Sequence, residues 1–151
     1  VKLEGGEKIS ENVKYLTSNN ITVIGHLGMQ PQSLDGNYKV FGRSREEKKQ
    51  IIKDLKYLED SGVMAIVLEC TIKSLVKEVL RIAKVPIIGI GATVECDGQI
   101  LVAEDLLGLS EFKSKFLKKY SNLRKIVSNS FFKFSEDVKN RKYPKRKHYY
   151  E

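Results

Sequence analysis

Two short apolar runs constrain the fold of this chain more than any other feature of its sequence. Val63–Leu68 contains no polar residue, and Val85–Ile90 is interrupted only by a proline and a glycine. Continuous apolar strands are typical of parallel sheets whose two faces are both covered. Both runs are far shorter than the ~18–20 apolar residues that a membrane span requires. The sequence therefore predicts buried strands and no membrane-spanning segment.

Helical patterns alternate with the strands along the first two thirds of the chain. The predicted strands are Val1–Gly5, Ile21–Gly25, Val63–Leu68 and Val85–Ile90, and the helices between them are Glu7–Asn19, Ser44–Gly62 and Thr71–Lys84. The clearest helix opens with a capping-box pattern, in which Ser44 and Glu47 stand three residues apart. Strict alternation of buried strands and helices indicates parallel βα units.

The number of these units sets the predicted architecture. About four strands in 151 residues are half of what a (β/α)8 TIM barrel needs, since a full barrel takes roughly 250 residues. We therefore predict an α/β fold in which residues 1–151 form the carboxyl-terminal half of a single TIM-barrel domain. A small doubly wound sheet is the competing prediction.

Residues 112–151 are expected to form a basic helical segment, with helices at Ser110–Tyr120 and Ser121–Asn140. The formal net charge of the chain is +8, which at first suggests a nucleic-acid partner. From Phe112 onward the charge is +10, whereas residues 1–111 carry −2. A basic nucleic-acid-binding module remains an alternative, but the nearly neutral body and the absence of a basic-aromatic motif favour a solvated tail and no nucleic-acid partner.

Ionisable side chains stand at or beside the predicted strand ends, where βα enzymes place their active sites. Lys2 and Glu4 are two residues apart and so share one face of their strand. His26 follows the second strand and opens a long loop, His26–Gly42, and Glu69 ends the third. Each has a structural alternative. Lys2 and Glu4 can form a solvated ion pair, the histidine can be structural, and Glu69 can cap the next helix.

The two cysteines carry no recognisable metal or disulfide pattern. Cys70 and Cys96 lie far apart in sequence, without a CxxC motif or a nearby histidine cluster. Reduced, inert thiols are the expectation, which favours a cytoplasmic protein.

Six segments together resemble one enzyme family over nearly the whole chain. They are Val1–Gly6, Gly25–Ser33, Tyr38–Arg43, Val67–Cys70, Val85–Ala92 and Asp97–Val102. In this order and spacing they closely resemble ketopantoate hydroxymethyltransferase of pantothenate and coenzyme A biosynthesis, a metal-dependent TIM barrel about twice this length. One departure is Thr93, where the family usually has a glycine.

The resemblance implies a reaction and its partners. A hydroxymethyl group would pass from 5,10-methylenetetrahydrofolate to 3-methyl-2-oxobutanoate, giving 2-dehydropantoate, with Mg²⁺ stabilising an enolate as a Lewis acid. By motif, Glu69 matches the proton acceptor, Glu4 a metal ligand, Lys2 a substrate-binding lysine and His26 a substrate-pocket histidine. Members of the family form large homo-oligomers, namely decamers, so a homo-oligomer is expected. Further metal carboxylates and a substrate-binding serine would lie upstream.

Two alternatives share this resemblance. One is a related metal-dependent barrel enzyme that acts on another 2-oxo acid, and the other is a fragment that folds without being active.

Overall fold

The computed structural model describes residues 1–33 and 39–150 and divides into two compact units, Val1–Ile100 and Leu101–Glu151. The first unit is an α/β sheet with helices, and it holds every residue of the candidate site. The second unit is helical. We describe the two units separately.

The first unit contains a parallel sheet of five strands. They are β1 (Lys2–Glu4), β2 (Ile24–Gly28), β3 (Ala65–Glu69), β4 (Ile87–Gly89) and β5 (Gly98–Gln99), and they pair in the order β1-β2-β3-β4-β5. The helical elements of this unit are η1 (Glu7–Ile9), α1 (Ser10–Ser18), η2 (Pro31–Ser33), α2 (Arg45–Asp60) and α3 (Lys73–Ile82). The predicted parallel α/β class is confirmed.

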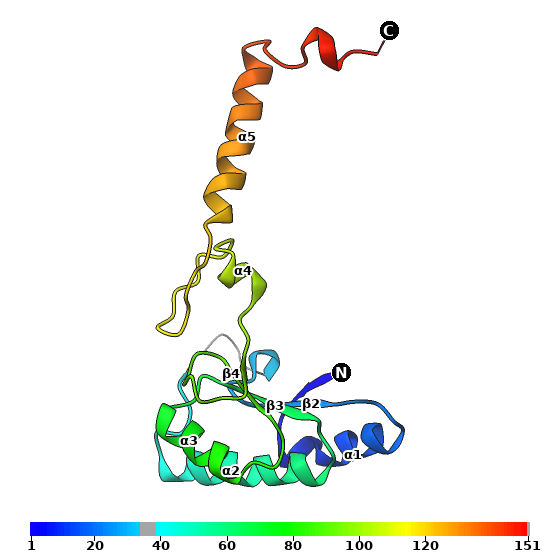
Figure 1. Cartoon of the computed structure of the whole chain (residues 1–151), viewed down its shortest axis with the longest axis vertical. Coiled ribbons are helices and arrows are strands. Elements are labelled where there is room, and N and C mark those ends of the chain that lie inside the picture. Colours follow the sequence, from blue (N-terminus) through cyan, green and yellow to red (C-terminus); the bar gives the residue numbers. More distant parts are fainter. Residues whose placement is uncertain (34–38, 151) are drawn as a thin grey trace. The chain divides into compact units, whose positions relative to one another are not determined.

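The strand order bears on the choice between a barrel and a doubly wound sheet. Connections between parallel strands are almost always right-handed, so strands that follow one another in sequence order keep all their helices on one face. Figure 1 shows α1, α2 and α3 together on the same side of the strands. A doubly wound sheet requires a point at which the strand order reverses, and the described strands contain none. The described strands are therefore wound in one direction only, unlike those of a doubly wound sheet, and the TIM barrel stays a prediction.

The hydrophobic core lies between the sheet and these helices. It includes Leu27, Ile66, Leu68 and Ile87 from the strands, Val13 from α1, Ile51, Leu55 and Leu58 from α2, and Leu75, Val76 and Val79 from α3. The buried apolar residues of α2 and α3 thus face the core. Ile52 and Leu80 are partly buried at its margin.

The boundaries of β2 correct the sequence prediction. The strand runs from Ile24 to Gly28 rather than from Ile21 to Gly25, and His26 lies inside it instead of opening a loop. Gly25 is a site of close packing and not a strand end, because a Cβ atom there would lie only 2.7 Å from Leu58 Cδ1 of α2. Residues 34–38 of the predicted loop lie outside the described residues. The short strand β5 was not predicted.

The predicted capping box of α2 is half confirmed. The Ser44 hydroxyl accepts a hydrogen bond from the Glu47 amide at 3.1 Å. The Glu47 carboxylate turns instead to the amides of Gly42 and Arg43, at 2.9 and 3.1 Å. A hydrogen bond from Lys39 is the main reason that the pKa of Glu47 is lowered from its usual value, and the two amide donors add to it. The carboxylate therefore ties the preceding loop to the start of α2.

The second unit contains α4 (Ala103–Leu106), α5 (Leu123–Lys139) and η3 (Arg146–His148). The helix predicted at Ser121–Asn140 is confirmed as α5, but the helix predicted at Ser110–Tyr120 is wrong, since these residues form turns and irregular backbone. Short helices need a packing surface to be stable. Here the Tyr120 amide donates to Leu106 O instead, at 2.8 Å, which draws the segment back to α4.

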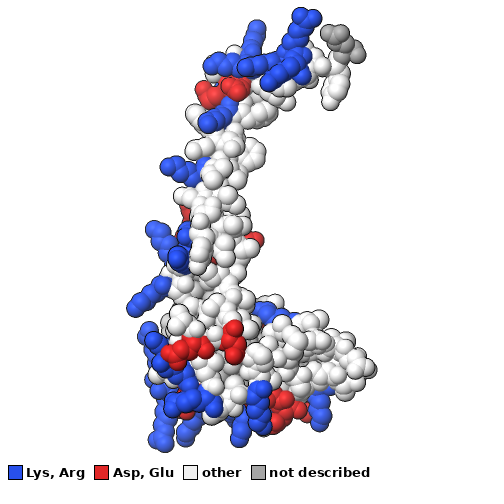
Figure 2. Space-filling view, in the orientation of Figure 1, with Lys and Arg blue, Asp and Glu red and all other residues white. Residues whose placement is uncertain are grey.

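Basic side chains gather at the end of the second unit, at the last residue of α5 and beyond it (Figure 2). Six lysine and arginine residues fall between positions 139 and 147, whereas the first unit displays charges of both signs. The apolar residues of α5 are exposed as well, including Phe131, Phe132 and Phe134. None of the described helices is long and apolar enough to cross a membrane.

Candidate active site

The four candidate residues share one face of the sheet, opposite the helices. Glu4 pairs with His26 in the register of β1 and β2, and Gly28 pairs with Glu69 in the register of β2 and β3. Side chains alternate between faces along a strand, so Lys2, Glu4, His26 and Glu69 all point the same way. The intervening residues Gly25 and Leu27 face the helices, as the contact of Gly25 with α2 shows. Alternation and register thus bring together side chains that are up to 67 positions apart in sequence.

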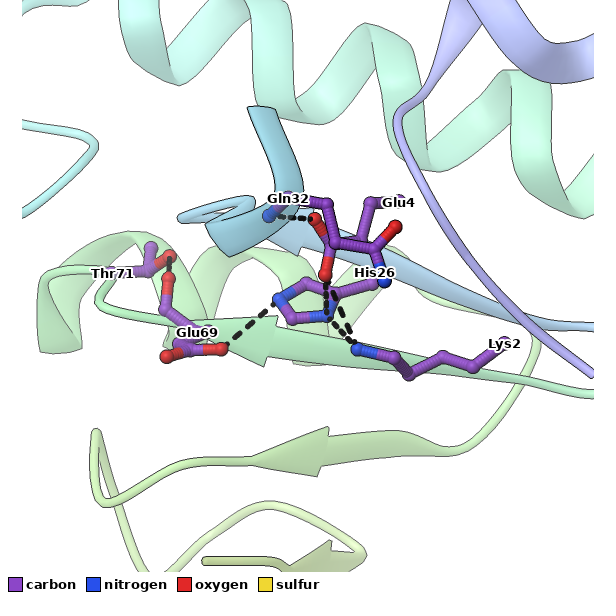
Figure 3. A network of polar contacts seen from close by, with 6 residues as sticks. All are labelled: Lys2, Glu4, His26, Gln32, Glu69 and Thr71. Atoms are coloured by element: carbon purple, nitrogen blue, oxygen red, sulfur yellow. Dashed lines mark hydrogen bonds and ion pairs between the residues drawn. The ribbon is translucent and has the colours of Figure 1, made fainter. Parts of the chain in front are cut away.

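His26 lies at the centre of this group, between Lys2 and Glu69 (Figure 3). Its Nδ1 atom is 3.0 Å from Lys2 Nζ and 3.9 Å from Glu4 Oε1, and its Nε2 atom is 3.3 Å from Glu69 Oε2. The residue is only 1% exposed. The two strands beside β2 therefore both contribute charged side chains within 3.9 Å of the imidazole, Lys2 and Glu4 from β1 and Glu69 from β3.

The contact with Lys2 assigns the proton of the neutral imidazole ring. An ammonium group can only donate hydrogen bonds, so Nδ1 must accept from Lys2 and Nε2 must carry the hydrogen. Nε2 is buried, and its contact with Glu69 does not have the geometry of a hydrogen bond. Among the described residues this N–H therefore has no hydrogen-bond acceptor, a state that is costly unless a ligand supplies one.

Glu4 is held by a cation on one oxygen and by backbone on the other. Lys2 Nζ donates to Oε1 at 3.4 Å, and the Gln32 amide donates to Oε2 at 3.0 Å. The Glu4 side chain is 6% exposed and that of Lys2 45%. The pair is thus not a freely solvated ion pair, because the carboxylate is buried and the amide of Gln32 in η2 fixes its orientation.

Glu69 ends β3 and turns toward His26 rather than toward the next helix. The residue at the amino-terminal cap of α3 is Ile72, and no side chain caps this helix. The carboxylate of Glu69 instead lies near His26 Nε2, as Figure 3 shows. The interpretation of Glu69 as a helix cap is therefore wrong, and its carboxylate lies on the same face as His26.

Cys70 adjoins the site but is a poor nucleophile. Burial, and to a lesser degree the nearby Glu69 carboxylate, together raise the pKa of its thiol to about 11. Both Cys70 and Cys96 are free cysteines, and burial also raises the pKa of Cys96. These values agree with the expectation of inert thiols.

The donor set of this face does not complete a metal site. No cluster of three or more His, Cys, Asp or Glu side chains within residues 1–33 and 39–150 could hold a metal ion. Glu4 is the candidate ligand, and its oxygens already contact Lys2 and Gln32. Residues of this chain therefore fit a metal ion only as contributors to a larger ligand set.

Comparison with known proteins places this arrangement in a family. A family model described as ketopantoate hydroxymethyltransferase matches residues 1–146. The chain belongs to the ketopantoate hydroxymethyltransferase family. A protein of Pelagibacter ubique named 3-methyl-2-oxobutanoate hydroxymethyltransferase is 50% identical over 99% of this chain, and proteins of the same name from Saccharolobus islandicus and Rhizobium rhizogenes are 44% and 43% identical over 100% and 98% of it.

The chain spans less than 60% of the length of these ketopantoate hydroxymethyltransferase relatives, namely 58%, 57% and 55% in the same order. All four candidate residues fall inside the matched region. The departure at Thr93 is accommodated locally. Thr93 is not among the residues of positive φ in the described chain, so its position makes no demand for glycine, and its carbonyl accepts a hydrogen bond from Gln99 Nε2 at 2.7 Å.

Sequence reasoning missed the backbone partners of these side chains. Gln32 acts on Glu4 through its amide, and Thr71 donates its hydroxyl to the backbone oxygen of Glu69 at 3.0 Å. Backbone contacts leave no mark on side-chain patterns, so no signal in the sequence would have found Gln32. The placement of Gly28 opposite Glu69 was likewise missed, although the cluster of glycines around His26 hinted at tight packing there.

Proposed function

We propose that this chain carries the carboxyl-terminal part of an active site that transfers a hydroxymethyl group to 3-methyl-2-oxobutanoate. The group would come from 5,10-methylenetetrahydrofolate, and with one water the products would be 2-dehydropantoate and tetrahydrofolate, in pantothenate and coenzyme A biosynthesis. One observation carries the proposal. Family membership coincides with a buried face on which a carboxylate, Glu69, lies beside an imidazole and an ammonium group.

The proton step would belong to Glu69. Its carboxylate accepts the proton from the third carbon of the 2-oxo acid, the C–H bond breaks, and the electron pair passes toward the ketone to give an enolate. Water would release the one-carbon unit from the folate as formaldehyde, with both of its C–N bonds breaking and the two nitrogens taking up the two protons of the water. The enolate carbon would then form a bond to the formaldehyde carbon, and the resulting alkoxide would take back the proton held by Glu69. Glu69 suits this role because it ends a strand and its side chain is largely buried but still 13% exposed.

Lys2 and His26 would hold the substrate. Lys2 offers an ammonium group that is 45% exposed and can reach the carboxylate of the 2-oxo acid. His26 offers the Nε2 hydrogen that has no normal acceptor among the described residues, and a substrate oxygen would supply one. Both groups would fix the third carbon of the substrate relative to Glu69.

Mg²⁺ is the metal ion that we propose for this site, with Glu4 as one of its ligands. When bound, such an ion would supply positive charge that favours the enolate. The site face itself carries two carboxylates and one ammonium group, so an anionic substrate needs further positive charge there. The remaining ligands would come from residues outside this chain.

The complete protein would be a TIM barrel in which residues 1–151 supply the carboxyl-terminal half. The sequential winding of the five strands supports this architecture. We also propose a cytoplasmic homo-oligomer, a decamer as in the family, with 112–151 as its basic segment. The exposed phenylalanines of α5 support a subunit contact there. No nucleic-acid or membrane partner is part of the proposal.

Isotope exchange tests the assignment of the base. The full-length protein with Mg²⁺ is incubated with 3-methyl-2-oxobutanoate in deuterated water, and the loss of hydrogen from the third carbon is followed. A positioned base contributes roughly 10²–10⁴-fold to proton transfer, so Glu69→Gln should lower the exchange rate by at least about 100-fold. Glu78→Gln, at an exposed position on α3, is the matched control. Undiminished exchange in Glu69→Gln would refute the assignment.

A second candidate is an enzyme that acts on a different 2-oxo acid. The residues on this face address the carboxylate, the ketone and one proton, which all 2-oxo acids with a hydrogen beside the ketone share. Turnover of several such acids with and without methylenetetrahydrofolate separates the two candidates. Exchange without any folate-dependent product would favour the second, and a full-length protein without exchange would favour an inactive form.

A further inference from the structure

The ends of β2 and β3 meet at Gly28 and Glu69, which are paired in the parallel register. The backbone oxygen of Glu69 accepts two hydrogen bonds at this junction, from the Met29 amide and from the Thr71 hydroxyl, both at 3.0 Å. The strand that carries the proposed base is therefore fastened to its neighbour by the base residue's own carbonyl group.

Gly28 leaves no room for a side chain at this junction. A Cβ atom on Gly28 would lie 2.0 Å from Glu69 O and 2.7 Å from Thr71 Oγ1, and the residue has a φ of +86°. Real Cβ atoms essentially never come closer than 3.0 Å to another heavy atom. The carbonyl oxygen of Glu69 would therefore have to retreat by about 1 Å, and it is backbone rather than the flexible end of a side chain.

Such a displacement would reach the carboxylate. The carbonyl carbon and Cβ of Glu69 are both bonded to its Cα, so a shift of the carbonyl turns the side chain away from its place 3.3 Å from His26 Nε2. Misplacing a reacting group by 1 Å can cost about 100-fold in rate. The position of the proposed base therefore depends on the absence of a side chain at Gly28.

We propose that Gly28 is a positioning residue for Glu69, because the absence of a side chain on the end of β2 lets the Glu69 backbone dock there and aims its carboxylate at the substrate face. This inference rests on the proposed function. It assigns Gly28 no contact with the substrate and no part in the proton transfer itself.

Gly62 provides a matched control. Its φ is +84°, almost the same as that of Gly28, but a Cβ atom there would meet only Thr17, at 3.4 Å or more. Gly62→Ala and Gly28→Ala therefore place an alanine at nearly the same unfavourable positive φ, and only the second adds the overlap with Glu69. The difference between the two variants isolates that overlap.

The test is the deuterium-exchange assay on the full-length protein, with kcat and KM determined separately and with folding followed by circular dichroism. We expect Gly28→Ala to lower kcat by about 100-fold with KM changed by less than about threefold, and Gly62→Ala to leave both near the parental values. Equal rates in the two variants would overturn the inference. So would an unfolded Gly28→Ala protein, because the overlap would then be a general packing requirement.

A double variant tests whether Gly28 acts through Glu69. In a Glu69→Gln background, Gly28→Ala should have no further effect on the residual exchange, since the group that it displaces is already gone. A further loss of about 100-fold would overturn the inference. Absence of exchange in the unsubstituted protein would refute the proposed function, and the positioning role would fall with it, a result distinct from loss in Gly28→Ala alone.

Discussion

Replacing Lys2 by methionine should weaken the binding of the 2-oxo acid more than it slows the chemistry. Methionine keeps an unbranched apolar side chain of similar length and removes only the ammonium group. In the structure that group has two partners, His26 Nδ1 at 3.0 Å and Glu4 Oε1 at 3.4 Å. In the proposed complex it gains a third, the carboxylate of the substrate.

The size of the effect follows from the exposure of Lys2. A hydrogen bond to a charged group contributes roughly 1.5–3 kcal/mol. The Lys2 side chain is 45% exposed, so water screens its charge and the lower end, about 1.5 kcal/mol, applies. A factor of ten corresponds to about 1.4 kcal/mol, and the KM for 3-methyl-2-oxobutanoate should rise about tenfold. We expect kcat to change by less than about threefold, because Glu69 keeps its place.

The assay is deuterium exchange over a range of substrate concentrations, with Lys8→Met as the control because Lys8 is an exposed lysine in η1. An unchanged KM for Lys2→Met, together with a fall in kcat, would refute the reasoning. That result would mean that Lys2 acts only by holding the proton of His26 on Nε2. In that case the loss of the ammonium group would free the imidazole to place its hydrogen on Nδ1, toward Glu4.

Two further predictions concern packing and thiol reactivity. Gly25→Ala places a methyl group 2.7 Å from Leu58 Cδ1 and should lower the free energy of unfolding by about 1–3 kcal/mol through overpacking; urea denaturation measures this, and a loss that Leu58→Ala fails to reduce in the double variant would contradict the explanation. Cys70, with a pKa of about 11 against a usual 9.0, should react with iodoacetamide about 100-fold more slowly near pH 8 than an unperturbed thiol, because only the thiolate reacts. Its labelling rate should rise until the pH passes about 11, and fast labelling at pH 8 would show that the thiol is not buried.

Most of the site could be predicted from the sequence because ionisable residues near the ends of parallel strands meet at one edge of the sheet, even where the predicted strand boundaries are wrong by a few residues. Lys2 and Glu4 share a face by the two-residue period alone, and Glu69 follows an apolar run that admits few other interpretations. The structure confirms that these side chains lie together with His26. Their chemical roles stay predictions.

The helix predicted at Ser110–Tyr120 failed for a different reason. Its apolar residues have helical spacing, but such a segment forms a stable helix only when its apolar face can pack against another surface. In the structure, Lys119 Nζ donates to Ser110 O at 2.9 Å and the Tyr120 amide donates to Leu106 O. These contacts satisfy groups that a helix would have used, and no local pattern encodes them.

The placement of His26 shows where sequence reasoning about a parallel sheet reaches its limit. A glycine in a β-branched run can mark a strand end or a close approach of another element. The first explanation predicts that the next residue lies in a loop, and the second predicts that it continues the strand. At Gly25 the second holds, because Leu58 of α2 occupies the space of the missing side chain. His26 is then a strand residue whose direction is fixed by alternation, and it must face away from α2. The packing of α2 against Gly25 thus determines that this imidazole points toward Glu4 and Glu69. A substitution on the core side of β2 should therefore change the position of His26 on the other face.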